Sequence, residues 1–323
     1  MFRTLVLCFV MFATGAGFSA HAQTYPSKPI RIVVPYTAGG PADLLVRALG
    51  QKLAELWGQQ VVVDNRPGAN EIIAAEAVAK SPGDGYTFLL ASDAVFSLNP
   101  YLYSKIPYDP AKDFVAVSKI VNANLMLVAR NGFPANNVKE LIEYAKQNPG
   151  KINYGSVGAG GVNHLSMSWF NSQQGLRMEH VPYKGLVQGL ADIAEGRLDV
   201  MFAVIGGAAP LIKADRIRGI AVSGRSRNAI IPNVPTFAEA GYPNFDASFY
   251  FGIVAPAGTP RDIVSKFATE AGKIVNAPEF KEKYLNNLGF EAVGDTPDQF
   301  AAFLKTDREL AAKKVQASGA KLD

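Results

Sequence analysis

The sequence predicts an α/β protein of two lobes, each a mixed, mainly parallel sheet flanked by helices. β-branched runs alternate with amphipathic segments along most of the chain, and this alternation is typical of parallel sheets covered by helices on both faces. Two such series follow one another, and each has a strand, a glycine loop and a helix in succession. With 323 residues, 48% hydrophobic and 19% charged, the chain is long enough for two lobes of this kind.

The first 22 residues differ from the rest. Arg3 precedes an apolar run from Leu5 to Phe12, and Ala-His-Ala stands before Gln23, as in a secretory signal cleaved after Ala22. A membrane anchor is the weaker interpretation because the apolar run is short. The single cysteine lies inside this segment, so the chain from Gln23 onward has no thiol for a disulfide, a metal or covalent catalysis.

The first series begins with the strand 29–36, the turn Gly39-Gly40-Pro41 and a helix from about Ala42 to Leu56. Pro41 is suited to the first turn of that helix. The following elements are expected as a strand and turn over 59–69, a helix over 70–80, and strands over 86–92, 113–121 and 124–130.

The second series has the same order of elements. We expect helices over 137–148, from Val162 onward and over 186–196, and strands over 151–156, 178–183, 197–204, 217–223 and 248–258. Three helices follow, over 259–276, 277–289 and 296–317, the last opened by a capping box of Thr296 and Gln299.

Two long apolar strands stand where the chain would cross between the lobes. These are 124–130 and 248–255. The predicted organisation is therefore a signal segment over 1–22, a first lobe from 23–123 plus 250–323, and a second lobe over 124–249.

The second glycine loop, "YGSVGAGGVNHL" over 154–165, fits no cofactor motif. Asn163 stands at the third position of a dinucleotide fingerprint, and the Gly-Lys-Ser/Thr of a P-loop is absent. As a nucleophile elbow around Ser156 it has Tyr154 in place of the first glycine. No HExxH motif is present either, so we expect no cofactor and no metal.

Few polar residues suggest catalysis. His180, within a strand, is expected to be structural, whereas His164, directly behind the glycine loop, either donates to an anion or caps the turn. Asp43 is expected to interact with the helix dipole, and no paired carboxylates are evident. The formal charge of +4 is spread without a basic block, which argues against nucleic acid. Two helix N-termini behind glycine loops therefore predict an anion that is held and not consumed.

The chain resembles the Bug family, the exported solute-binding proteins of tripartite tricarboxylate transporters. The resemblance rests on the order and spacing of several motifs along the mature chain: "YPSKPIRIVVPYTAGGPADLLVRALGQKL", "VVVDNRPGA", "SPGDGYTFLLAS", "YDPAKDF", "NYGSVGAGGVNHL", "HVPYKG", "IRGIAVSGRSR", "VPTFAEAGYP" and "FGIVAPAGTP".

The resemblance implies a type II-like periplasmic binding protein. Both of its lobes would contact the ligand in the cleft between them, and the protein would deliver the ligand to membrane permease subunits. It implies a monomer that captures a small carboxylate and has no catalytic residues. The implied ligand contacts are Tyr36, Ala38, Gly39, Gly40 and Ser92 in the first lobe, and Ser156, Gly160, Gly161, Asn163, His164 and Ala203 in the second.

The expected ligand is a dicarboxylate with one carboxylate at each glycine loop. Ala203 stands where many relatives carry an aspartate that would suit a ligand ammonium, so no free ammonium is expected. Tyr36, Phe96 and Phe249 could form apolar walls for an aromatic diacid; the alternative is that their rings belong to the core. A secreted hydrolase with a cryptic Ser/His site and a sensor without transport remain the alternatives.

Overall fold

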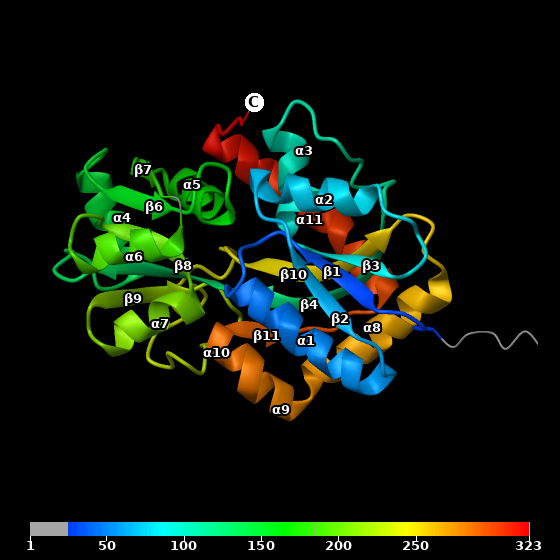
Figure 1. Cartoon of the computed structure of the whole chain (residues 1–323). Coiled ribbons are helices and arrows are strands. Elements are labelled where there is room, and N and C mark those ends of the chain that lie inside the picture. Colours follow the sequence, from blue (N-terminus) through cyan, green and yellow to red (C-terminus); the bar gives the residue numbers. More distant parts are fainter. Residues whose placement is uncertain (1–24, 184, 323) are drawn as a thin grey trace, which may run out of the picture.

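Two mixed β-sheets organise the computed structural model of the chain, which describes residues 25–183 and 185–322 (Figure 1). The predicted signal segment, residues 1–22, lies outside the described residues. In spatial order the first sheet contains β11 (Phe290–Ala292), β4 (Phe114–Ala123), β10 (Phe249–Pro256), β3 (Thr87–Ala91), β1 (Ile30–Val34) and β2 (Val61–Asn65). The second contains β7 (Glu179–Pro182), β6 (Asn153–Ser156), β8 (Val200–Val204), β5 (Leu125–Arg130) and β9 (Ile217–Val222).

Helices cover both faces of each sheet. Those that follow the first-sheet strands are α1 (Pro41–Trp57), α2 (Ile72–Ala79), α3 (Asn99–Leu102), α8 (Arg261–Asn276), α9 (Pro278–Phe280), α10 (Asn286–Leu288) and α11 (Pro297–Ser318). Those around the second sheet are α4 (Val138–Gln147), α5 (Val162–Gln174), α6 (Leu186–Ala194) and α7 (Ile205–Lys213). The capping box predicted at Thr296 and Gln299 is confirmed at the start of α11.

Both sheets are mixed, as predicted, but they are not mainly parallel. Among the strand pairs of the described residues, four are parallel and five antiparallel. The parallel pairs join the strands of the strand–helix–strand series, β1 to β3 and β6 to β8. The strands reached from the other sheet, β5 and β10, run against their neighbours. Alternation of strands and helices predicts the parallel pairs, whose strands are joined by a helix, but not the antiparallel pairs of β5 and β10.

The segments expected to cross between the lobes are interior strands. β5 lies between β8 and β9, and β10 lies between β3 and β4. The chain passes from the first sheet to the second at Asn124, between β4 and β5, and it enters the first sheet again at Phe249.

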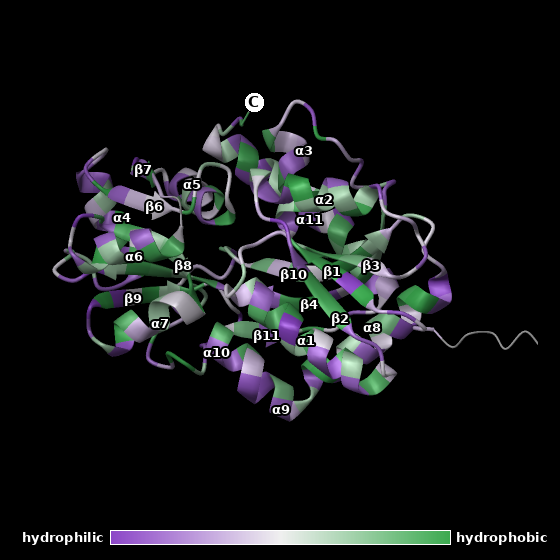
Figure 2. Ribbon diagram, viewed as in Figure 1, coloured by the Kyte–Doolittle hydropathy of each residue, from purple (hydrophilic) through white to green (hydrophobic). Residues whose placement is uncertain are grey.

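Each sheet has a separate apolar layer on each face. In the first sheet, α1 and α8 bury Leu45 and Phe267 on one face, while α11 buries Phe300 with Tyr250 on the other. In the second sheet, Phe170 of α5 and Ile193 of α6 belong to separate clusters. Figure 2 shows mainly hydrophobic strands between helices that carry hydrophilic residues on their outer sides.

One smaller apolar cluster joins helices of the first sheet to a helix of the second. Leu102 of α3, Leu165 of α5 and Val315 of α11 are buried together. In Figure 1 the end of α11 lies beside α5. This contact places the second glycine loop, which precedes α5, next to helices that belong to the first sheet.

Candidate functional site

The first glycine loop connects β1 to α1 and is bound by a carboxylate of the same helix. Asp43, which is buried, accepts a hydrogen bond from the Gly39 amide at 2.8 Å. Arg47 Nε and Asn65 Nδ2 donate to the same carboxylate at 2.9 Å each. Gly39 has φ +82°, a conformation that favours glycine. The Gly39 amide, one of the predicted ligand contacts, therefore already has an acceptor within the protein.

The carboxylate of Asp43 is held in its charged form. Burial raises its pKa, but hydrogen bonds from Arg47, the Gly39 amide and Asn65 outweigh this, and the net pKa lies below the usual value. The acid lies in the first turn of α1, where it also interacts favourably with the helix dipole, the role that the sequence predicts.

Glu71 brings together two other predicted contacts of the first lobe. The Tyr36 hydroxyl donates to Glu71 Oε1, and Ser92 donates from its hydroxyl to Oε1 at 2.5 Å and from its amide to Oε2 at 3.1 Å. Glu71 is 5% exposed, and burial raises the pKa of its carboxyl group although these donors lower it. Tyr36 and Ser92 are thus neighbours, as expected of one site, but their donors point to a protein carboxylate.

The backbone at Glu71 is unusual. Ala69, Asn70 and Glu71 all have positive φ, with +71° at Glu71, a region that costs a residue with a side chain roughly 1–2 kcal/mol. Asn99 Nδ2 donates to the Asn70 carbonyl at 2.8 Å and helps to fix the turn. Glu71 is not recognisable from the sequence, because the residue pattern predicts a helix over 70–80, whereas α2 begins at Ile72.

The second glycine loop, between β6 and α5, is bound by uncharged groups. Ser156 Oγ lies 2.6 Å from His180 Nε2 and 2.9 Å from the Gly158 carbonyl. The Gly160 amide donates to His164 Nδ1 at 3.1 Å. That contact requires a neutral His164 with its proton on Nε2.

The two histidines stack on one another, with ring centroids 4.0 Å apart, and Tyr154 stacks on His180 at 5.0 Å. Burial, together with the neighbouring His180, lowers the pKa of His164 to about 4, and burial lowers that of His180 as well. His180 is therefore structural, as predicted, but it also orients Ser156, which the sequence analysis did not foresee.

The Ser156–His180 contact does not form a catalytic triad. Ser156 is fully buried, and among the described residues no carboxylate hydrogen-bonds to His180. A hydrolase of this type needs a group that orients the imidazole behind an accessible nucleophile.

Two further predicted contacts of the second lobe are engaged in packing. Asn163 Nδ2 donates to the Phe202 carbonyl at 2.8 Å and so fastens α5 to β8. Ala203 is fully buried on β8, opposite Met126 of β5, within an apolar cluster. Ala38 is exposed, and Gly161, the residue before α5, is half-buried.

The two loops do not touch one another through hydrogen bonds. Within the part of the chain that the structure describes, none joins Tyr36, Glu71 or Ser92 to the loop 157–161. The second loop instead lies against α3 and the segment after α11: a Cβ on Gly160 would come within 2.6 Å of Leu322 and 3.1 Å of Leu102.

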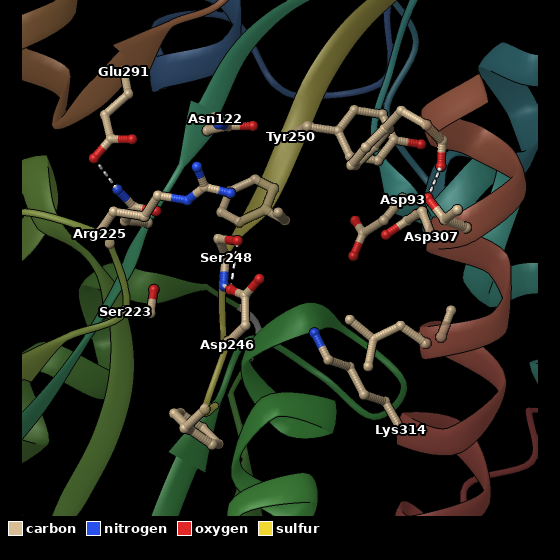
Figure 3. Close-up of a pocket in the computed structure, with 18 of the residues that line it drawn as sticks. Asp93, Asn122, Ser223, Arg225, Asp246, Ser248, Tyr250, Glu291, Asp307 and Lys314 are labelled. Carbon is tan, nitrogen blue, oxygen red and sulfur yellow. Dashed lines mark hydrogen bonds between the residues drawn. The ribbon is translucent and has the colours of Figure 1, made fainter. Parts of the chain in front are cut away.

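A cavity of about 910 Å³ lies between the two sheets on the side of α11 (Figure 3). None of the predicted ligand contacts lines it, although Asp93 follows Ser92 directly. Its volume lies within the usual range for small-molecule sites. It is walled by β4, β10, α11 and the segment after β9, with Lys119, Arg225, Asp246, Glu291 and Lys314 among its charged residues.

Asp93 and Asp307 face one another in this cavity (Figure 3). Burial and then the charge of Asp307 raise the pKa of Asp93 to about 7, and Ser97 Oγ donates to Asp307 at 2.5 Å. The sequence shows no paired carboxylates suited to acid/base work, and these two carboxyl groups become neighbours only in the fold. The pair was not visible in the sequence because α11 brings Asp307 back from the far end of the chain.

Several known proteins are similar to this chain. Residues 45–319 match the family model described as the tripartite tricarboxylate transporter family receptor, TctC. Protein BugT of Bordetella pertussis is 33% identical over 325 residues, covering 100% of this chain and 99% of that protein.

Two solved structures of Rhodopseudomonas palustris proteins are also similar. Rpa4515 with adipate is 34% identical, with a TM-score of 0.83, covering 92% of this chain and 100% of that one. MatC with bound malate is 27% identical, with a TM-score of 0.77, covering 90% and 100%. The resemblance to binding receptors that the motifs predict is confirmed, and the chain belongs to the tripartite tricarboxylate transporter receptor family.

Proposed function

We propose that this protein is a periplasmic receptor that captures a small carboxylate between its two lobes and delivers it to the permease subunits of a tripartite tricarboxylate transporter. The observation that carries the proposal is the junction of β6 and α5, where a glycine loop and the hydroxyl of Ser156 precede a helix N-terminus. Such junctions bind anions through main-chain amides and the helix dipole.

The proposed lobes are 23–123 with 250–323, and 124–249. The division is supported by the sheets, because β1 to β4, β10 and β11 belong to one and β5 to β9 to the other. The signal over 1–22, cleavage after Ala22 and a monomeric state belong to the same proposal.

The second lobe would hold the ligand carboxylate through Ser156, Gly160 and Gly161, with His164 keeping the loop in place. The Gly160 amide and the Ser156 hydroxyl donate to His164 Nδ1 and to the Gly158 carbonyl, so binding would exchange these bonds to uncharged acceptors for bonds to the ligand carboxylate. Asn163 and Ala203 would act behind them, by fixing α5 to β8 and by lining the strand with an uncharged residue.

The first lobe would contribute Tyr36, Ala38, Gly40 and Ser92, with Gly39 shaping the turn; Tyr36 and Ser92 would act through Glu71, to which both donate. A dicarboxylate is the ligand class that the sequence predicts, and the adipate and malate in the structures of similar proteins support it. An aromatic diacid is less well supported, since Phe96 is buried in one apolar cluster of the first sheet and Tyr36 and Phe249 pack against the other, although Phe249 also lines the cavity.

A carboxylate screen tests the proposal. Thermal unfolding is measured with mono-, di- and tricarboxylates, and the compounds that raise the Tm are taken to calorimetry, with chromatography of the recovered ligand. We expect saturable binding of at least one small carboxylate, which is recovered unchanged. Stabilisation by none of them, or conversion of an ester or amide analogue into product, would contradict the proposal.

A further inference from the structure

We propose that Glu71 determines which ligands enter the first-lobe end of the site, by making that end accept a hydrogen-bond donor instead of a second ionised carboxylate. The inference rests on the proposed function and narrows it. It distinguishes the two ends of the ligand, which the glycine loops alone would treat as equivalent.

The first step is that Glu71 occupies the donors expected to hold a ligand anion. The Tyr36 hydroxyl and the hydroxyl and amide of Ser92 all donate to it. Two of these bonds go to Oε1 and one to Oε2. Because a carboxylate has about four acceptor positions, one position on Oε2 remains for a donor on the ligand.

The second step is that no cation offsets this carboxylate. Among the described residues, none of the ion pairs includes Glu71. The titratable groups that interact with it are Tyr36 after β1, Asp93 after β3, Tyr108 and Tyr250 of β10. All of them are acids. A second ionised carboxylate placed here would meet repulsion without a compensating charge.

The third step is the backbone of the turn that carries Glu71. A glutamate at φ +71° occupies a conformation in which glycine would be unstrained. Residues held in such conformations cluster at ligand-binding sites. A glycine would build the turn more easily, so a buried acid in this strained position favours a role at the ligand over a role in the turn alone.

The fourth step is the contrast with the other end. Around the second loop the donors also have acceptors within the protein, but these are uncharged: the Gly160 amide donates to His164 Nδ1 and Ser156 contacts His180 and the Gly158 carbonyl. The ligand carboxylate therefore belongs at the second lobe, and an amide, a hydroxyl or an ammonium group belongs near Glu71. A dicarboxylate can still bind, provided that its first-lobe carboxyl and Glu71 share one proton.

Calorimetry with matched pairs tests the inference. The probes are succinate, glutarate and adipate, each compared with its own monoamide at pH 7.5. For the chain length that binds, we expect wild type to bind the monoamide roughly tenfold more tightly than the diacid, since each unit of unfavourable pKa shift corresponds to a factor of about ten.

Two variants extend the test. Glu71→Gln keeps the size of the side chain, and Glu71→Gly removes it and relieves the turn. Both should tighten diacid binding roughly tenfold and leave monoamide binding within about threefold. Glu76→Gln removes a charge from α2, the helix that begins directly after Glu71; Glu76 is paired with Lys80, and its loss should change neither value.

The outcomes separate the two proposals. Tighter binding of the diacid by wild type, or an unchanged diacid preference in both Glu71 variants, overturns the role of Glu71 and leaves the receptor function intact. Binding of no diacid and no monoamide of any length contradicts the receptor function itself. If a variant does not fold, the wild-type comparison of the pairs alone decides.

Discussion

The first glycine loop lies between two carboxylates, Asp43 and Glu71, whereas the second lies beside two uncharged histidines, His164 and His180. Both loops follow a parallel strand and open a helix. The backbone motif is the same, but the side chains that other elements supply give it opposite chemistry. A glycine loop at a helix N-terminus thus predicts where a ligand lies better than which charge it carries.

The two regions also respond to pH in opposite directions. Burial raises the pKa of Glu71 and Asp93 in the first lobe, and it lowers the pKa of both histidines in the second. Each shift favours the uncharged form of its group. The stability that Glu71 and Asp93 contribute should fall as pH rises, and that of the two histidines as pH falls; the charged Asp43, whose pKa is lowered, differs from the other two acids and loses its contribution as pH falls.

Asp93→Asn should give the largest effect. The folded chain keeps a proton on Asp93 up to about pH 7, whereas the unfolded chain releases it near pH 4. Wild type therefore loses up to about 4 kcal/mol of unfolding free energy between these pH values, and the variant should lose much less. Denaturant unfolding at pH 5 and 8 measures this. An equal change of unfolding free energy between pH 5 and 8 in the two proteins would contradict the raised pKa of Asp93 in the first lobe.

Ser156→Ala should weaken ligand binding ten- to hundredfold. Its hydroxyl is proposed to donate a charge-assisted hydrogen bond worth about 1.5–3 kcal/mol. Calorimetry with the tightest carboxylate of the screen measures the loss. Ser168→Ala is the matched control, because Ser168 lies on α5 but contacts Tyr154 at 3.2 Å. Similar affinities for the two variants would place the carboxylate elsewhere.

His164→Asn should give the smallest of these effects. The asparagine oxygen can still accept from the Gly160 amide, but it cannot be protonated. Since the pKa of His164 is about 4 in the folded chain and about 6.5 in the unfolded one, wild type loses stability as pH falls through this range. We expect wild type to lose about 1–2 kcal/mol of unfolding free energy over this pH range, because solvent screens the partly buried ring.

The variant should resist acid better than wild type. NMR titration of wild type provides a direct check, with the His164 ring signals unchanged above pH 5. Titration of that ring near pH 6.5 would contradict the uncharged second loop.

Much of the fold could be predicted from the sequence because its signals are local. The order of strands and helices, Pro41 after a glycine turn and the capping box at Thr296 each need only a few neighbouring residues. The antiparallel strands β5 and β10 could not be predicted in this way. Their direction depends on where the chain returns from, not on their composition.

The site was predictable only in its backbone. Tyr36 and Ser92 were both expected as first-lobe ligand contacts, and the structure joins them through Glu71, a residue that the sequence does not single out. Glu71 follows a turn of non-glycine residues with positive φ, which no residue pattern in that stretch indicates. Asp93 and Asp307 meet only because α11 packs back on the first sheet.

A crystal structure with a bound half-amide is the most direct test of the difference between the two lobes. Adipate monoamide has two ends of similar size and unlike charge, so its orientation reports which lobe holds the anion. We predict its carboxylate at Ser156 and the loop 158–161, and its amide nitrogen within hydrogen-bond distance of Glu71 Oε2. A carboxylate bound by Tyr36 and Ser92, with Glu71 displaced from them, would contradict the account.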